Sequence, residues 1–325
     1  MTGKDQPPKT VTGELGASWT RYWAGGHGAS FGAGGEDFDS APFWLEFFAT
    51  LADGASVLDL ATGGGHVVRL ALEAAAKADR AYEIHGVDLA DIGALRRAFG
   101  PSGRSTLRLT GRCDLARLPF DDAAFNAVTS QFGIEYADTG AAAREAVRVL
   151  KPGGSGLFLL HHAGSAITRA AGERLRAHRV VLPDDSAFRH GERVFTILSS
   201  GAPRLAAMTE VTKFQSAVQA ALGRLSPDAR LSNTAEVVYF LADVARAPDR
   251  YDPRDALRRL LAAEEEVRHW MLRQQALIDA ALDTPGVQAL AQALEAAGAQ
   301  VRAPEPFRDA SGTLLAWTLG FRRGG

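Results

Sequence analysis

Residues 57–66 constrain the fold of this chain more than any other stretch. Residues 57–60 form a short, mostly apolar run, which predicts a buried strand. Three consecutive glycines at 63–65 then predict a tight turn, because only glycine takes a positive φ without steric cost. The following residues, 67–76, are good helix formers. A strand, a glycine turn and a helix N-terminus together predict a nucleotide pocket, since the backbone can approach the ligand and free N–H groups face it.

The spacing of the glycines indicates which nucleotide is bound. The dinucleotide fingerprint needs a further glycine at position 68, where this chain has Val68, so a nicotinamide dehydrogenase is disfavoured. The first motif of class I S-adenosylmethionine-dependent methyltransferases, Asp/Glu-x-Gly-x-Gly-x-Gly, resembles residues 59–65, with Ala61 in place of the first glycine. The resemblance implies S-adenosylmethionine as the cofactor. The residues that it assigns to the cofactor site are Asp59, Ala61, Thr62, Gly63 and Gly65.

Two later segments supply further candidate cofactor residues. The predicted strand at 81–89 ends in Asp88 and Leu89, and a carboxylate there can accept hydrogen bonds from both hydroxyls of a ribose. Residues 105–121 resemble the family's Asp-x-x-x-Leu-Pro-Phe segment after the third strand. That resemblance implies that Asp114 accepts the adenine amino group and that Leu115 packs on the ring.

The fourth predicted strand and the string after it complete the resemblance. Gln131 and Phe132 follow the strand at the carboxyl edge of a parallel sheet, where ligands bind, so both are predicted cofactor residues. Asn126 departs from the family pattern, which has an aspartate one residue later. Leu-Lys-Pro-Gly-Gly at 150–154 is typical of the family and is expected to be structural. An Asn-Pro-Pro-Tyr string does not occur, which disfavours methylation of DNA bases.

The order of these motifs predicts an α/β fold. We expect a Rossmann-like, doubly wound, seven-stranded and mostly parallel sheet, with its last two strands at 299–302 and 313–322. The methyltransferase domain is predicted to consist of residues 53–164 and 286–325.

Two segments lie outside this predicted domain. Residues 165–285 carry helical patterns and predict a helical insertion between the fifth strand and the last helix. We interpret it as a substrate lid; the alternative is a subunit interface, which would make the protein a homodimer. Residues 1–52 are predicted to form an N-terminal cap. Its candidate substrate and cofactor residues are Trp19, Tyr22 and Trp23.

Composition excludes several classes of function. The formal net charge is −2, so the chain has no basic footprint for nucleic acid. The single cysteine, Cys113, allows neither an internal disulfide nor a zinc cluster, and no metal is expected. The N-terminus lacks an apolar signal sequence and no stretch is long and apolar enough to span a membrane. We therefore expect a cytoplasmic protein that does not bind membranes.

The expected reaction is methylation of a small molecule at oxygen or nitrogen by in-line displacement. An oxygen nucleophile also needs a base, and His161 and His162 are the candidates because they end the predicted fifth strand and histidine titrates near neutral pH. Glu135 is a further candidate, while His66 and His27 are weaker ones. Two alternatives stay open: a peptide or protein methyltransferase that docks its substrate on the insertion, and a non-catalytic protein that binds S-adenosylmethionine. The identity of the acceptor is not predicted.

Overall fold

The computed structural model describes residues 13–26, 39–100, 103–225 and 233–325. The first twelve residues and most of the glycine-rich part of the predicted cap, His27 included, lie outside these ranges. The chain forms two compact units: unit 1 consists of Met1–Arg169 and Ala276–Gly325, and unit 2 of Ala170–Gln275.

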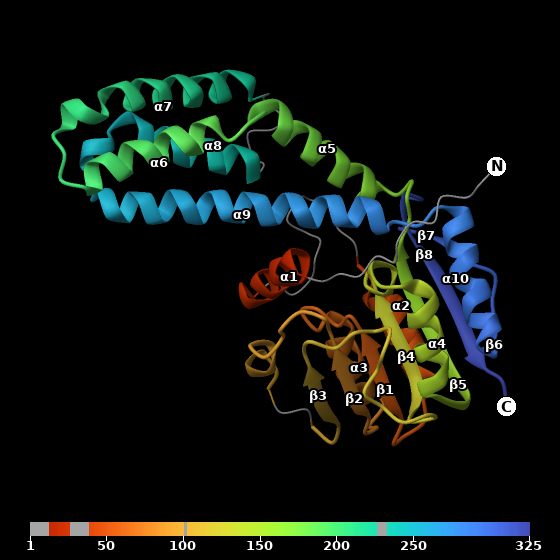
Figure 1. Ribbon diagram of the computed structural model, residues 1–325. Helices are drawn as coiled ribbons and strands as arrows, with labels where there is room; N and C mark the ends of the chain where they lie inside the picture. Colours follow the sequence, from red (N-terminus) through yellow and green to blue (C-terminus); the bar gives the residue numbers. More distant parts are fainter. Residues whose placement is uncertain (1–12, 27–38, 101–102, 226–232) are drawn as a thin grey trace. The chain divides into compact units, whose positions relative to one another are not determined.

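Unit 1 is built around one sheet (Figure 1). Its strands are β1 (Ser56–Leu60), β2 (Glu83–Val87), β3 (Thr106–Thr110), β4 (Phe125–Gln131), β5 (Leu150–His161), β6 (Ala299–Val301), β7 (Glu305–Arg308) and β8 (Leu314–Arg323). The strand order is β3-β2-β1-β4-β5-β8-β6, with β7 also paired to β8. Strands β1 to β5 are parallel to one another, and β8 is antiparallel to β5. The predicted doubly wound, mostly parallel sheet is confirmed.

The pairing register of the sheet places the carboxyl ends of its central strands at the same edge. Leu60 pairs with Val87 on one side and with Ser130 on the other. The direction of chain progression across the sheet reverses between β1 and β4, and ligands of open parallel sheets bind at such a switch point. The polar residues that follow β1, β2 and β4 therefore lie at the edge where a ligand is expected.

The described sheet has eight strands rather than the expected seven. The additional strand is β7, whose pairing with β8 is antiparallel and shifts in register between Phe307 and Arg308. Pro306 lies within β7 and cannot donate a backbone hydrogen bond, which is tolerated in a strand with a single partner.

Helices cover both faces of the sheet. They are α1 (Glu14–Ala24), α2 (Ala41–Ala49), α3 (His66–Lys77), α4 (Thr139–Val149) and α10 (Thr284–Ala296), with two short 3-10 turns, η1 (Leu95–Ala98) and η2 (Ile134–Tyr136). One face packs against α2 and α3, and the other packs against α4 and α10. Alternation along β1 explains the two layers, because Val57 enters the first core and Leu58 enters the second.

The regular elements in the described residues of unit 2 are helices. Its helices are α6 (Ser186–Ser199), α7 (Arg204–Arg224), α8 (Asn233–Arg246) and the 3-10 turn η4 (Pro248–Arg250), with most of α5 (Ala166–Val181) and of α9 (Pro253–Ala280). These helices bury a hydrophobic core of their own that includes Phe195, Phe214 and Leu260. None of the helices in the described residues has both the length and the low polarity needed to cross a membrane. The same residues contain no group of three or more His, Cys, Asp or Glu arranged to hold a metal ion.

Candidate active site

The turn between β1 and α3 has the sharp backbone geometry that its glycines predict. Ala61, Gly63 and Gly65 have positive φ angles of 53°, 50° and 74°. The amide of Thr62 donates to the carbonyl of Val87 at 2.9 Å, and the amide of Gly65 donates to the carbonyl of Thr62 at 2.7 Å. The turn is therefore fixed to the end of β2, where the next candidate residue lies.

Two glycines in this turn leave no room for a side chain. A Cβ atom at Gly63 would lie 2.5 Å from the Trp23 ring, and one at Gly65 would lie 2.7 Å from the Phe99 ring. Helix α1 thus rests directly on the turn through Trp23. The Trp19 and Trp23 rings stack 5.7 Å apart, and Tyr22 contacts Trp23 edge-on at 4.9 Å. The three aromatic residues predicted from the cap segment form one cluster beside the candidate cofactor site.

Asp88, the predicted ribose-binding acid, lies beside the glycine turn. Its Oδ2 accepts a hydrogen bond from the Gly63 amide at 2.8 Å, and its Oδ1 accepts one from the Ala90 amide at 2.8 Å. Each carboxylate oxygen has two lone pairs, so both can accept a further bond. Burial raises the pKa of Asp88 to about 6, while the two amides oppose this shift. The charged form of this carboxylate is therefore costly to bury.

Asp59 is a second buried carboxyl group in the same region. It is 2% exposed, and its Oδ1 accepts a hydrogen bond from the Thr129 hydroxyl at 2.9 Å. Burial raises its pKa to about 7; the hydroxyls of Thr62 and Thr129 oppose this shift, and the nearby Asp88 adds to it. Asp59 and Asp88 thus place two buried acids close together near the ends of adjacent strands.

The predicted adenine-binding segment follows β3. The Asp114 side chain is exposed, and its Oδ1 accepts a hydrogen bond from the Ala116 amide at 2.9 Å. Leu115 is 6% exposed and belongs to the core. The preceding residue, Cys113, donates its amide hydrogen to the Asp88 carbonyl at 2.9 Å, which ties this loop to the end of β2. Leu89, also predicted as a cofactor residue, is half-buried beside Asp88.

Gln131 lies in a hydrogen-bond network that the sequence does not reveal. Its Oε1 accepts a hydrogen bond from the Ser40 hydroxyl at 2.9 Å and another from the Trp44 indole. The Ser40 hydroxyl also contacts the His66 Nε2 at 3.0 Å. His66 begins α3 directly after the glycine turn, and burial lowers its pKa. Ser40 and Trp44 are thus placed near the turn by α2, although no motif marks them.

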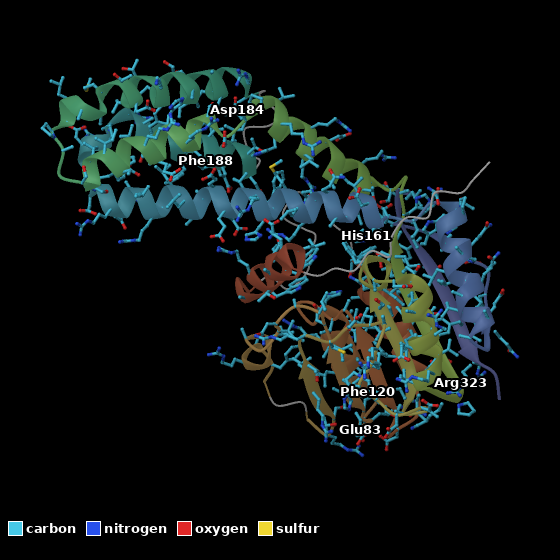
Figure 2. All side chains as sticks on the ribbon, viewed as in Figure 1. Glu83, Phe120, His161, Asp184, Phe188 and Arg323 are labelled. Carbon is cyan, nitrogen blue, oxygen red and sulfur yellow. The ribbon has the colours of Figure 1, made fainter. Side chains whose placement is uncertain are left out.

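His161 and Glu135 form a buried pair at the carboxyl end of β5, where Figure 2 labels His161. The Glu135 Oε1 lies 2.8 Å from the His161 Nδ1 and also accepts the His161 amide hydrogen at 2.9 Å. Both residues are at most 2% exposed. The Phe132 ring lies 4.3 Å from the imidazole, and the Tyr136 ring contacts it edge-on at 5.8 Å.

His162 has a different environment from its neighbour. Its ring stacks on Trp317 at 4.4 Å, and its Nδ1 accepts the Gly164 amide hydrogen at 2.8 Å. Its carbonyl accepts a hydrogen bond from the Thr168 hydroxyl at 2.9 Å. Burial lowers the pKa of His162. These contacts are those of a residue that ends a strand, so the geometry favours His161 over His162 as a candidate base.

Asn126, which departs from the family pattern, lies away from this site. Its Oδ1 accepts hydrogen bonds from the amide of Ser56 at 3.0 Å and from the Lys151 Nζ at 2.9 Å. Ser56 is the first residue of β1, so Asn126 joins the amino ends of the central strands, and its role there is structural.

Comparison with known proteins gives a match to the segment that contains the glycine turn and Asp88. Residues 58–158 match the family described as "Methyltransferase domain". The ubiquinone/menaquinone biosynthesis C-methyltransferase UbiE of Xanthomonas oryzae pv. oryzae (strain MAFF 311018) is 36% identical over 130 residues, which are 36% of this chain and 47% of that protein. The chain thus spans about half the length of this curated relative. The matched segment begins in β1, ends in β5, and contains the glycine turn and Asp88.

Solved structures with similar folds include two that extend over most of the chain. An S-adenosylmethionine-dependent methyltransferase from Mesorhizobium loti is 15% identical, with 90% of this chain and 100% of that one covered and a TM-score of 0.43. A protein described as a methyltransferase of the same type, from Listeria monocytogenes, is 13% identical, with 88% and 100% covered and a TM-score of 0.41.

Proposed function

We propose that residues 58–158, which match a methyltransferase domain, bind S-adenosylmethionine, and that the protein transfers a methyl group to a small-molecule acceptor. The observation that carries this proposal is the contact between the Asp88 carboxylate and the Gly63 amide at 2.8 Å. It places a candidate ribose-binding acid directly beside the glycine turn.

The residues fit S-adenosylmethionine. Asp88 would hold the ribose hydroxyls, Asp114 would accept the adenine amino group, and Leu115 would pack on the ring. The two buried acids, Asp59 and Asp88, suit a ligand with a positive charge. Bound S-adenosylmethionine supplies a methyl group already activated by its sulfonium charge. The protein's own task is therefore to align the acceptor with that methyl group and to exclude water.

The burial of the candidate base supports a small acceptor. His161 and Glu135 are almost fully enclosed by protein. A group this deeply buried is more easily reached by a small molecule than by a peptide backbone, which would bring unsatisfied polar groups with it.

Titration calorimetry with Asp88→Asn tests the proposal. The substitution keeps the size of the side chain but replaces one accepting oxygen with an NH₂ group that cannot accept from a ribose hydroxyl. Hydrogen bonds to charged groups contribute about 1.5–3 kcal/mol, so the Kd for S-adenosylmethionine should rise about 10- to 100-fold. Glu83→Gln is the matched control, because Glu83 is an exposed acid at the other end of the same strand (Figure 2). Unchanged affinity in Asp88→Asn, or equal loss in both variants, would contradict the assignment.

A further inference from the structure

The buried pair of His161 and Glu135 has two polar atoms that the fold does not satisfy. Among the residues that the structure describes, neither the His161 Nε2 nor the Glu135 Oε2 has a hydrogen-bond partner. Buried polar groups in proteins are nearly always hydrogen-bonded, so two unpaired atoms in one contact pair point to a ligand. Their position after β5 and β4, at the carboxyl edge of the sheet, is that of a reacting group.

The contacts of Glu135 determine which imidazole nitrogen is free to act. The Glu135 Oε1 lies 2.8 Å from the His161 Nδ1, and an ionised carboxylate can only accept hydrogen bonds. The Nδ1 must therefore carry the hydrogen. In the neutral ring the Nε2 then has a lone pair that no hydrogen bond occupies, and this is the atom that a general base uses. Glu135 also accepts the His161 backbone amide, so it fixes both the orientation and the tautomer of the ring.

Aromatic rings contact the imidazole of His161. Phe132 and Tyr136 contact the imidazole directly, and Trp19 of α1 contacts Tyr136 edge-on at 6.0 Å. Rings in offset or edge-on contact favour a planar aromatic guest. A phenol is also a chemically suitable acceptor for this base. The pKa of a phenolic hydroxyl is about 10, whereas the pKa of water is about 16, so a phenol gives up its proton to an imidazole far more easily.

We propose that His161 is the general base for methylation of a phenolic hydroxyl and that Glu135 is its positioning residue; this rests on the proposed function. The acceptor O–H bond breaks and its proton moves to the His161 Nε2. The oxygen electron pair forms the new O–C bond, while the electrons of the C–S bond leave with sulfur, which becomes a neutral thioether. Protons and charge therefore balance without an additional reactant.

The test compares two classes of phenol in the full-length enzyme with S-adenosylmethionine. Catechol and 4-methylphenol are un-ionised at pH 8, whereas 4-nitrophenol is largely ionised and needs no base. His161→Asn keeps a donor for Glu135 but removes the base. It should lower kcat for the un-ionised phenols about 100-fold or more and for 4-nitrophenol less than about 5-fold, because general-base catalysis contributes about 10²–10⁴-fold. Equal loss for both classes, or no loss for either, would overturn the role of His161.

Glu135→Gln tests the positioning role. It should lower kcat for catechol while the KM for catechol and the Kd for S-adenosylmethionine change less than about 2-fold. Imidazole ¹⁵N shifts should show the Nδ1–H tautomer of His161 in the wild type and a mixture of tautomers in Glu135→Gln. A wild-type ring with its hydrogen on Nε2 would overturn this part of the proposal.

A half-buried His–Glu contact elsewhere in the chain provides a control. The His190 Nδ1 lies 2.7 Å from the Glu210 Oε2 between α6 and α7 of unit 2. His190→Asn should leave kcat for catechol unchanged, and a loss equal to that of His161→Asn would contradict a specific role.

Calorimetry distinguishes failure of the phenolic acceptor from failure of the methyltransferase assignment. If the wild type binds S-adenosylmethionine but methylates none of the three phenols, or methylates a ring carbon, the phenolic hydroxyl is refuted while the methyltransferase assignment stands. If it binds no S-adenosylmethionine, the proposed function itself fails.

Discussion

Replacing Asp59 by asparagine should stabilise this protein at neutral and alkaline pH. Asp59 is buried in β1, where removal from water disfavours its charged form and raises its pKa to about 7 from a usual value of 3.8. Asparagine has nearly the same shape, and its Oδ1 can still accept a hydrogen bond from the Thr129 hydroxyl. In the wild type the Thr129 Oγ1 lies 2.9 Å from the Asp59 Oδ1. The substitution therefore removes the buried charge and keeps the hydrogen bond.

The magnitude follows from the pKa difference between the folded and unfolded chain. Between about pH 4 and pH 7 the unfolded chain has lost this proton while the folded chain keeps it, so wild-type stability falls as pH rises through this range. Each pKa unit corresponds to about 1.4 kcal/mol, which sets the full penalty at about 4 kcal/mol above pH 7. We expect Asp59→Asn to raise the free energy of unfolding by about 2–4 kcal/mol at pH 8 and by nearly nothing at pH 4.

Urea unfolding followed by tryptophan fluorescence measures this effect. Four of the five tryptophans lie in unit 1, so the signal reports mainly on the unit that contains Asp59. Glu83→Gln, which removes an exposed acid from β2, is the control and should change stability by less than about 0.5 kcal/mol at either pH. A stability gain that does not depend on pH, or a loss at pH 8, would refute the reasoning. The variant should also bind S-adenosylmethionine less tightly, because a cationic ligand loses a buried anionic partner.

Two further substitutions test the packing of the glycine turn. A Cβ at Gly133 would lie 2.3 Å from the Ala61 Cβ, so Gly133→Ala should lower the free energy of unfolding by about 1–3 kcal/mol. The double variant with Ala61→Gly should recover most of this loss. Additive effects of the two substitutions in urea unfolding would contradict the contact. Trp23→Ala should raise the Kd for S-adenosylmethionine about 10-fold in calorimetry, because the Trp23 ring lies against Gly63. A tenfold change in Kd corresponds to a loss of about 1.4 kcal/mol of binding free energy. An unchanged Kd would exclude a covering role for this ring.

The central sheet was predictable from sequence because its signals are local. The central parallel strands are rich in apolar residues and are followed by turns with polar or glycine residues, so the strands and the candidate ligand edge can be identified together. The β1 turn shows this most clearly, since the positive φ angles of Gly63 and Gly65 favour glycine.

Strand β7 was missed because a long-range pairing forms it, and helix α6, inside the predicted helical insertion, has only a weak signal of its own. Strand β7 is only four residues long and contains Pro306, so nothing in its own sequence favours a strand; its pairing with β8 creates it. Helix α6 contains Gly191, which weakens a helical pattern. The structure explains the glycine, since a Cβ there would lie 3.1 Å from the Phe214 ring of α7.

The candidate site was predictable only in part for the same reason. Asp59 and Asp88 follow from their places at strand ends, although their assignment to the cofactor stays a prediction. The link of Gln131 to Ser40 and Trp44 joins residues about 90 positions apart and has no sequence signal. The sequence also offers His161 and His162 as equal candidates, because it does not show that Glu135 contacts only the first of them. Whether residues 165–285 act as a lid or as a subunit interface stays a prediction as well.

A crystal structure of the full chain with S-adenosylhomocysteine bound tests the central claim most directly. We predict that both ribose hydroxyls lie within hydrogen-bond distance of the Asp88 carboxylate, with the nucleoside against the Gly63–Gly65 turn and its amino group near Asp114. A nucleoside bound elsewhere, or an Asp88 carboxylate that contacts only the amides of Gly63 and Ala90, would contradict the account.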